Sequence, residues 1–300
     1  MPSSPKMAWN GIKRSNKRQG RDFSALPFVS VLLLYDQPTE GNGKPQKNES
    51  GPGLPDNVPD SYGFVIVTRR RLLKRRWNDL FSIYNRFLQD NGDSISAARP
   101  VFFNLSLSQL NRELKAGCLF CSMLKEKGIF LYDNTGRRLA RRCKFDFRKI
   151  RDDVRKYYEE MLLVADEFLW CAERSHKERK SRSAMFMLHQ VAENYLHTAF
   201  YVYIQYGIKF HDIDRWLDYC RLLIPEFASV FPQNTEEDIR LYHLLQSAYI
   251  KARYDRYYPA SDNETALLLL RIRELRYLTV QVCRERFECY DRMIPRKDIR

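Results

Sequence analysis

Long apolar runs without charge are absent from this sequence of 300 residues. No stretch of about 18 apolar residues is uncharged, and no apolar core follows the basic N-terminal segment, so neither a membrane span nor a secretory signal is predicted. A regular cysteine framework is absent too, because the cysteines are odd in number, seven residues scattered from Cys118 to Cys289, which favours reduced thiols over disulfides. We therefore expect a cytoplasmic protein that makes no contact with membranes.

Acidic residues are scarce in the first half of the chain. Residues 1–150 contain 27 lysines and arginines against 13 aspartates and glutamates, whereas residues 151–300 contain 24 of each class. The first half thus carries the whole net charge of +14. This asymmetry indicates a domain boundary near the middle of the chain and predicts that the first half attracts polyanions.

Secondary-structure signals also change in kind along the chain. Before about residue 135, short apolar runs typical of strands, at 28–35, 64–67, 101–103 and 129–132, alternate with segments of helical spacing at 72–88, 107–114 and 119–124, which predicts a small α/β domain. After residue 146, apolar residues recur every three or four positions, which predicts a bundle of five roughly up-and-down helices. The expected fold class is therefore α+β, a small α/β domain followed by an all-α bundle. The expected helices of the bundle are Ile150–Ala172, Ser183–Tyr206, Asp212–Leu223, Glu236–Tyr254 and Glu264–Tyr290.

Domain boundaries follow from the same signals and from composition. Residues 36–60 combine Pro, Gly, Asn and Asp with almost no apolar side chain, so we expect a long flexible insertion there. The expected organisation is a basic disordered tail at 1–24, the α/β domain at 25–135 with this insertion, a basic linker at 136–148, the helical bundle at 149–292 and a tail at 293–300.

Two parts of the chain resemble known families. The stretch that contains Leu-His-Gln-x-x-Glu at 188–193 and Ala-Tyr-x-x-Ala-Arg-Tyr at 248–254 resembles the HEPN domain, a helical bundle. Residues 101–140 resemble the second half of the minimal nucleotidyltransferase domain that is often fused before a HEPN domain. The two-domain layout is similar to that of kanamycin nucleotidyltransferase. The resemblance implies that the α/β domain is nucleotidyltransferase-like.

The residues that carry catalysis in the nucleotidyltransferase family are missing here. In that family a Gly-Ser pair follows the first strand, and an Asp-x-Asp pair with a third carboxylate binds two magnesium ions that clamp an in-line phosphoryl transfer. This sequence has Asp36-Gln37, Ser61-x-Gly63 and Asn104 at those places. The resemblance therefore implies a decayed domain that binds no metal. The alternative is a relocated metal site, built from Asp36, Glu40, Asp56 and Asp60.

Basic residues gather in two runs of the first half. Arginine interleaved with aromatic residues suits phosphate contacts and base stacking, which predicts nucleic-acid binding. A solvated basic face is the alternative, because a cluster without a defined groove specifies no ligand. The expected nucleic-acid-binding residues are Arg69, Arg70, Arg71, Lys74, Arg75 and Arg76, beside Trp77, and Arg137, Arg138, Arg141 and Arg142.

The HEPN resemblance raises a second catalytic question. Ribonucleases of that family use an Arg-x4–6-His motif, in which the histidine exchanges a proton with the ribose 2′-hydroxyl and the arginine steadies the phosphate. Arg182 and His189 have this spacing. Their place in the bundle departs from the usual place of the motif, where this sequence has Arg253 and no histidine. A ribonuclease built on Arg182 and His189 is therefore the weaker alternative.

A polar group inside the bundle is expected to bind the ligand. His189 and Glu193 are four residues apart and share a helix face, as do Tyr249 and Arg253. A glutamate that points inward from an apolar helix needs a cation, and Arg253 is the expected partner of Glu193. A polar network that only fixes helix register is the alternative. The expected ligand-binding residues are His189, Glu193, His211, Tyr249, Arg253 and Tyr254.

One further motif is a pair of cysteines at Cys118 and Cys121. Its spacing is that of redox or zinc sites, but no second pair or histidine cluster lies nearby in the sequence. Both thiols fall on a short helix that must bury apolar surface, so we expect core cysteines.

These observations favour a non-catalytic HEPN protein that binds a nucleotide or RNA, with a decayed nucleotidyltransferase domain. No cofactor is expected other than a bound nucleotide, and the expected assembly is a homodimer through the HEPN bundle. Two alternatives stay open: an enzyme, either a HEPN ribonuclease or a nucleotidyltransferase with a relocated metal site, and an oligomerising interaction protein. The family resemblance alone suggests a defence, toxin–antitoxin or mobile-element context.

Overall fold

The computed structural model describes residues 29–35, 61–68, 99–127, 129–133, 138–208 and 210–295. The chain divides into two units, Met1–Cys143 and Lys144–Arg300. The tail at 1–24, the insertion at 36–60 and the basic run at 69–76 lie outside the described residues, and so do Arg137 and the helix expected over residues 72–88.

The first unit contains a four-stranded sheet in the order β3-β2-β1-β4. Strand β2 pairs in parallel with β3, whereas β1 pairs antiparallel with both β2 and β4. The expected strand runs at 64–67, 101–103 and 129–132 lie on β2, β3 and β4. The bounds are β1 (Val29–Tyr35), β2 (Ser61–Thr68), β3 (Arg99–Ser106) and β4 (Ile129–Asp133).

Two short helices, α3 (Leu107–Ala116) and α4 (Leu119–Lys127), follow β3. The Ser106 hydroxyl accepts a hydrogen bond from the backbone N–H of Gln109 and so caps the start of α3. Gly117 ends α3 in the left-handed region, with φ of 77°, where a residue without a Cβ is least strained. These two signals place Cys118 at the turn between α3 and α4.

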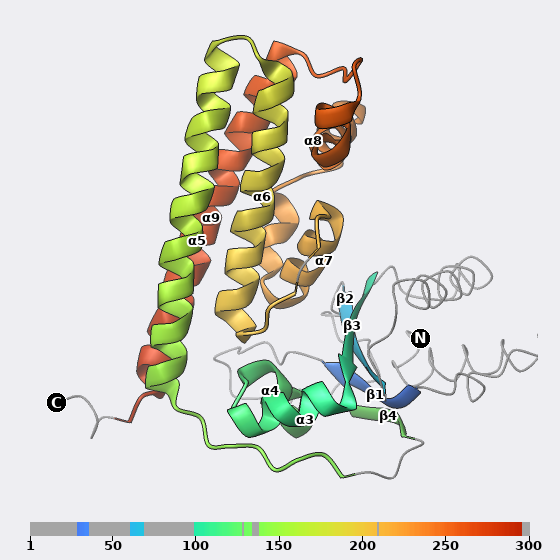
Figure 1. The fold of residues 1–300 in the computed structure, drawn as a ribbon, viewed down its shortest axis with the longest axis vertical. Helices are drawn as coiled ribbons and strands as arrows, with labels where there is room; N and C mark the ends of the chain where they lie inside the picture. Colours follow the sequence, from blue (N-terminus) through green and yellow to red (C-terminus); the bar gives the residue numbers. More distant parts are fainter. Residues whose placement is uncertain are drawn as a thin grey trace, which may run out of the picture. The chain divides into compact units, whose positions relative to one another are not determined.

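The second unit is an all-α bundle (Figure 1). All five expected helices are present, but they differ in length: α5, α6 and α9 are long and lie side by side, whereas α7 and α8 are shorter and pack against α6. The expected up-and-down arrangement therefore describes the three long helices only. The bounds are α5 (Phe147–Lys177), α6 (Ser181–Ile204), α7 (Ile213–Leu223), the 3-10 turn η2 (Pro225–Ser229), α8 (Glu236–Tyr254) and α9 (Asp262–Met293).

Helix α6 occupies the centre of the bundle because its sequence is apolar on almost every side. Arg182 and Glu193 are its only Lys, Arg, Asp or Glu residues, and a helix that is apolar all round has to be covered on all sides. It packs against α5, α7, α8 and α9. Any polar side chain in the middle of α6 is therefore held inside the protein, and this is what positions the candidate site.

None of the helices in the described part of the chain combines the length and the apolar character that a membrane crossing requires.

Candidate functional site

His189 lies in the middle of α6, and its side chain is only 1% exposed. Its Nδ1 is 3.0 Å from the Leu245 carbonyl oxygen of α8. A carbonyl can only accept, so Nδ1 carries the proton and Nε2 bears the lone pair in the neutral ring. Burial lowers the pKa of His189 from 6.5 to about 4. The imidazole is therefore neutral near pH 7, and its Nε2 has no hydrogen-bond partner among the described residues.

Glu193, one helical turn after His189, lies between two histidines. Its carboxylate accepts a hydrogen bond from Nδ1 of His211, with distances of 2.9 and 3.1 Å to the two oxygens. Nε2 of His189 is 3.8 Å from Oε2 of Glu193, which is too long for a hydrogen bond. Burial raises the pKa of Glu193, and His211 offsets this only in part. The carboxylate thus accepts a hydrogen bond from one imidazole near the solvent, while the second imidazole, inside the bundle, forms no hydrogen bond with it.

His211 belongs to the segment between α6 and α7, and its side chain is 56% exposed. Its ring stacks on Tyr249 of α8, with centroids 4.6 Å apart and an angle of 14° between the planes. The Arg253 guanidinium lies over the Tyr249 ring, 4.3 Å from the ring centroid. His211, Tyr249 and Arg253 therefore form a stacked group at the edge of the bundle, connected to the interior by Glu193.

The expected pairing of Glu193 with Arg253 is wrong. Arg253 is exposed, its Nε donates to the Tyr249 carbonyl at 2.6 Å, and its guanidinium also lies over the rings of Phe186 and Tyr254. No ion pair joins Arg253 to Glu193, because His211 occupies the carboxylate instead. His211 is 18 positions from Glu193 in the sequence, so helical spacing carries no signal for this contact.

Arg182 lies at the start of α6, and its guanidinium is engaged at the end of α8. It donates to the Ala252 carbonyl at 2.5 Å and to the Arg253 carbonyl at 2.8 Å. Carbonyl groups at the end of a helix lack partners within the helix and attract cations, so this is a helix-capping contact. Arg182 and His189 are two helical turns apart, about 10 Å along the axis. The structure does not bring this pair together around a common phosphate.

The chain segment around the end of α8 exposes two aromatic rings. The side chains of Tyr254 and Tyr257 are 75% and 82% exposed. Arg253 and Arg256 alternate with them and are exposed as well. We call these four residues the α8 terminal surface. Sequence reasoning named Arg253 and Tyr254 but missed Arg256 and Tyr257, although the alternation of arginine and tyrosine was a visible signal.

Tyr258 shows why this surface holds its shape. Its side chain is buried, and its hydroxyl donates to the Leu244 carbonyl of α8 at 2.7 Å. The backbone after α8 is thereby tied back to the helix while the neighbouring tyrosines remain outside.

A comparison with family models supplies the assignment of this region. Residues 158–281 match the HEPN domain. The expectation of a HEPN domain is thus confirmed for these residues, which extend from α5 into α9. All the candidate ligand-binding residues lie within the match. No curated protein matches the chain.

In the first unit, the positions considered for catalysis lie on the sheet or outside the described residues. Ser61 and Gly63 lie on β2, paired with Arg99 and Val101 of β3. Asn104 lies on β3, three residues after Val101, and its side-chain amide donates to the Ile66 carbonyl at 3.1 Å. The acidic residues weighed for a relocated metal site, Asp36, Glu40, Asp56 and Asp60, lie outside the described residues.

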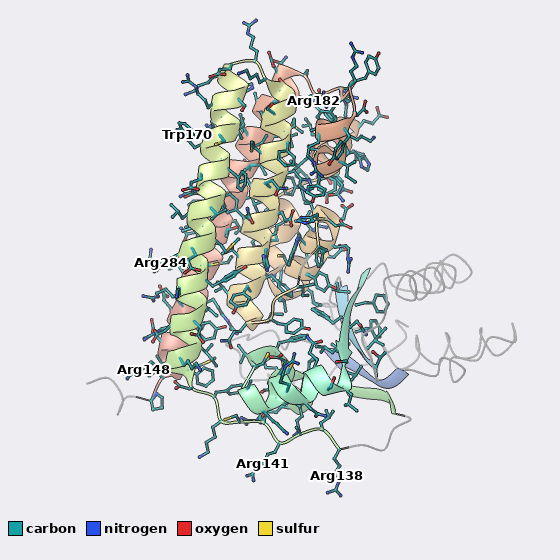
Figure 2. The ribbon with its side chains drawn as sticks, in the orientation of Figure 1. Arg138, Arg141, Arg148, Trp170, Arg182 and Arg284 are labelled. Carbon is teal, nitrogen blue, oxygen red and sulfur yellow. The ribbon has the colours of Figure 1, made fainter. Side chains whose placement is uncertain are left out.

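The basic residues before the HEPN domain are described only in part. Arg138 and Arg141 are exposed and project away from the chain (Figure 2). Arg142 is ion-paired with Glu126 of α4, so it is less available to an external phosphate than its neighbours. Within the described parts of both units, no three His, Cys, Asp or Glu side chains are arranged to hold a metal ion.

Proposed function

We propose that the HEPN domain binds single-stranded RNA or a nucleotide without cleaving it, and that the α8 terminal surface makes the contact. The observation that carries this proposal is the exposure of Tyr254 and Tyr257, each directly after an exposed arginine, Arg253 or Arg256. Exposed rings offer stacking platforms worth about 1–3 kcal/mol per base, and arginine supplies phosphate contacts. His211 and Tyr249 extend the same aromatic surface toward Glu193.

Two features argue against cleavage by the Arg182 and His189 pair. His189 is buried and neutral, with Nδ1 engaged by Leu245, so it cannot reach a ribose without a rearrangement of α6 and α8. Arg182 already donates to carbonyls of α8. A general base must come within hydrogen-bond reach of the proton that it abstracts, and its pKa must suit the working pH.

The N-terminal unit is proposed to be a decayed nucleotidyltransferase domain that performs no catalysis. Support comes from Ser61 and Gly63 at the positions where the family carries its paired carboxylates, and from Asn104, whose amide is used within the sheet. The exposed Arg138 and Arg141 are proposed to add phosphate contacts. A defence, toxin–antitoxin or mobile-element role rests on the family resemblance alone.

The binding proposal is tested by fluorescence anisotropy with a labelled single-stranded RNA over a range of salt concentrations. The double variant Tyr254→Ala and Tyr257→Ala should weaken binding at least about tenfold, because two stacking platforms are lost. The matched control, Tyr254→Phe with Tyr257→Phe, keeps both rings and should bind like the wild type. Equal affinity of the alanine variant and the wild type would contradict the proposal.

The charges of the surface are tested by the salt dependence of the same affinity. Replacing Arg253 and Arg256 by alanine should reduce the slope of log affinity against log salt by about 0.7 per lost phosphate contact. Arg284→Ala is the control, because this exposed arginine of α9 (Figure 2) is ion-paired with Glu288 on its own helix and lies outside the α8 terminal surface. Shortening of the RNA during the measurement, abolished by His189→Gln, would favour the ribonuclease.

A second candidate function, assembly into a homodimer, is favoured by one surface of the bundle. Trp170 of α5 is 67% exposed and projects away from the bundle (Figure 2). Leu163 lies two turns earlier on the same face of α5, and Leu270 and Tyr277 are exposed on the neighbouring α9. Exposed aromatic side chains that gather with leucines mark interaction surfaces. We propose that a second copy of the chain covers this face.

Light scattering after size-exclusion chromatography tests the dimer. The wild type should elute with twice the mass of one chain, and Trp170→Arg should shift it to the monomer, because a charge in the centre of an apolar contact opposes association. Trp170→Phe, which preserves an apolar ring, is the control. A wild-type monomer at all concentrations would rule out this assembly.

A further inference from the structure

Cys118 and Cys121 are held in a geometry that suits a disulfide. Cys118 immediately precedes α4: its N–H donates to the Glu113 carbonyl at 3.0 Å, and its carbonyl accepts from the Ser122 N–H at 3.1 Å. These two hydrogen bonds fix its backbone between α3 and α4. Residues three apart at the start of a helix have Cα atoms about 5 Å apart, within the range that a disulfide spans.

The two thiols contact each other and are electrostatically unlike. The Cys118 sulfur accepts hydrogen bonds from the Cys121 thiol and from the backbone N–H groups of Cys121 and Phe120. These three donors stabilise a thiolate and lower the pKa of Cys118, although burial and Glu113 oppose them. Donation to Cys118 and burial raise the pKa of Cys121. The N–H donors around its sulfur, together with its greater exposure, assign Cys118 as the nucleophile of the pair and Cys121 as the protonated partner.

Access is also unequal. Cys121 is fully buried, whereas Cys118 is 8% exposed. Neither cysteine is part of a disulfide in the structure. The combination of spacing, mutual contact and unequal thiols indicates chemistry beyond packing.

We propose that Cys118 and Cys121 are a redox-active dithiol, which a small-molecule disulfide such as oxidised glutathione converts to an intramolecular disulfide. The Cys118 thiolate attacks one sulfur of the oxidant, a mixed disulfide forms, and one thiolate leaves. Cys121 then gives its proton to water, and its thiolate attacks the Cys118 sulfur and releases the second thiol. Two electrons pass from the cysteine pair to the oxidant, whose two sulfurs leave as thiols.

This disulfide is a chemical modification of the protein and contributes little to the stability of the fold. It closes a loop of one helical turn, and a loop this short restricts the unfolded chain very little. Its formation removes the hydrogen bond between the thiols and changes the contacts at the start of α4, where the neighbouring Phe120 packs on Phe103 of β3 with ring centroids 5.0 Å apart. The effect of oxidation should therefore be local to α4 and the sheet.

Peptide mass spectrometry of the full chain tests the proposal directly. Trypsin cleavage after Lys115 and Lys125 places both cysteines in one peptide, residues 116–125, without any other cysteine. After incubation with oxidised glutathione, the protein is unfolded in denaturant and alkylated, and this peptide should be two hydrogens lighter than the reduced peptide and carry no alkyl group. The buried Cys220 and Cys283 are the controls and should be fully alkylated in the same sample. A doubly alkylated 116–125 peptide would overturn the proposal.

Two single variants test the order of attack. Cys121→Ser should stop at the mixed disulfide, with glutathione on Cys118. Cys118→Ser should leave Cys121 reduced, because its thiol is buried and protonated. Glutathione on Cys121 in the second variant, or none on Cys118 in the first, would contradict the assigned roles. The wild-type measurement needs no variant, so poor folding of either substitution leaves the main test intact.

Discussion

Asp166 on α5 and Glu193 on α6 are both partly buried carboxylates of the same bundle, but their partners differ. Asp166 accepts hydrogen bonds from Nε and one terminal nitrogen of Arg276, at 2.7 and 2.6 Å, and from the Tyr195 hydroxyl at 2.5 Å. Glu193 has one hydrogen-bonded imidazole near the solvent and one unbonded imidazole inside. The first carboxylate is saturated with strong donors, and the second is not.

The pKa values of the two groups shift in opposite directions for this reason. Burial acts to raise the pKa of Asp166, but hydrogen bonds from Arg276 and Tyr195 outweigh it, so the pKa falls below its ordinary value. Burial dominates at Glu193, and its pKa rises. A bidentate guanidinium stabilises a carboxylate more strongly than a single imidazole does. Asp166 therefore stabilises the fold, whereas Glu193 and His211 belong to the group that we propose contacts a ligand.

Removing the cation of the saturated site should have the largest effect. Arg276→Ala leaves Asp166 with Tyr195 alone, and we expect the free energy of unfolding to fall by about 2–3 kcal/mol, limited by the partial exposure of both groups. Arg273→Ala, one turn earlier on α9, is the matched control. Its guanidinium is more exposed than that of Arg276 and donates to only one oxygen of Glu173, at 2.7 Å for the closer nitrogen, so its loss should cost about 0.5 kcal/mol. Urea unfolding monitored by circular dichroism measures both. Equal losses of unfolding free energy would show that the pair of Asp166 with Arg276 contributes no more to stability than the pair of Glu173 with Arg273.

Lowering the pH should destabilise the folded protein through the protonation of His189. The folded pKa of His189, about 4, lies below the ordinary 6.5, so the unfolded chain binds protons more tightly and stability is lost as the pH falls from 6.5 toward 4. Between about pH 7 and about pH 5, His189 should cost about 2 kcal/mol. Glu193 acts in the opposite direction, because a raised carboxyl pKa favours the folded state in acid.

The variant His189→Gln isolates the histidine contribution. Glutamine can still donate to the Leu245 carbonyl, so folding near pH 7 should be largely intact, while the acid loss of about 2 kcal/mol should disappear. His243→Gln changes an exposed histidine of α8 and serves as control. Thermal melts at both pH values compare the three proteins. A wild type and a His189→Gln variant that lose stability equally in acid would contradict the burial of a neutral imidazole.

The smallest effect is expected at Arg253, because Glu193 does not depend on it. Arg253→Ala removes exposed contacts with aromatic rings and should cost no more than about 0.5–1 kcal/mol of stability. Arg182→Ala, which frees the carbonyls of Ala252 and Arg253 at the end of α8, should cost more, about 1–2 kcal/mol. Melting temperatures of the two variants decide the order. A larger loss for Arg253→Ala would restore the pairing with Glu193 that the sequence suggested.

Much of the helical bundle was predictable because its signals are local. Helix α8 was expected at its observed bounds, and α6 lies within two residues of its expectation. Helix α5 is longer than expected at both ends, since its terminal turns are rich in charged residues and carry no apolar period. The capping box of Ser261 and Glu264 at the start of α9 was also visible as a sequence signal.

The partners of the site residues were less predictable. Helical spacing correctly placed His189 beside Glu193 and Arg253 beside Tyr249, because residues four apart share a face. It could not find His211 as the partner of Glu193, since a loop and the packing of α8 bring them together. The stack of His211 on Tyr249 depends on the same packing.

The sequence by itself determined where the helices of the bundle lie, because apolar periodicity is a property of neighbouring residues. It also determined the charge asymmetry between the two halves. Only the tertiary structure decided which carboxylate receives a guanidinium and which receives an imidazole, and which aromatic rings stay outside. Those outcomes depend on how α8 and α9 pack against α5 and α6, and contacts between segments far apart in the chain leave no periodic trace in the sequence.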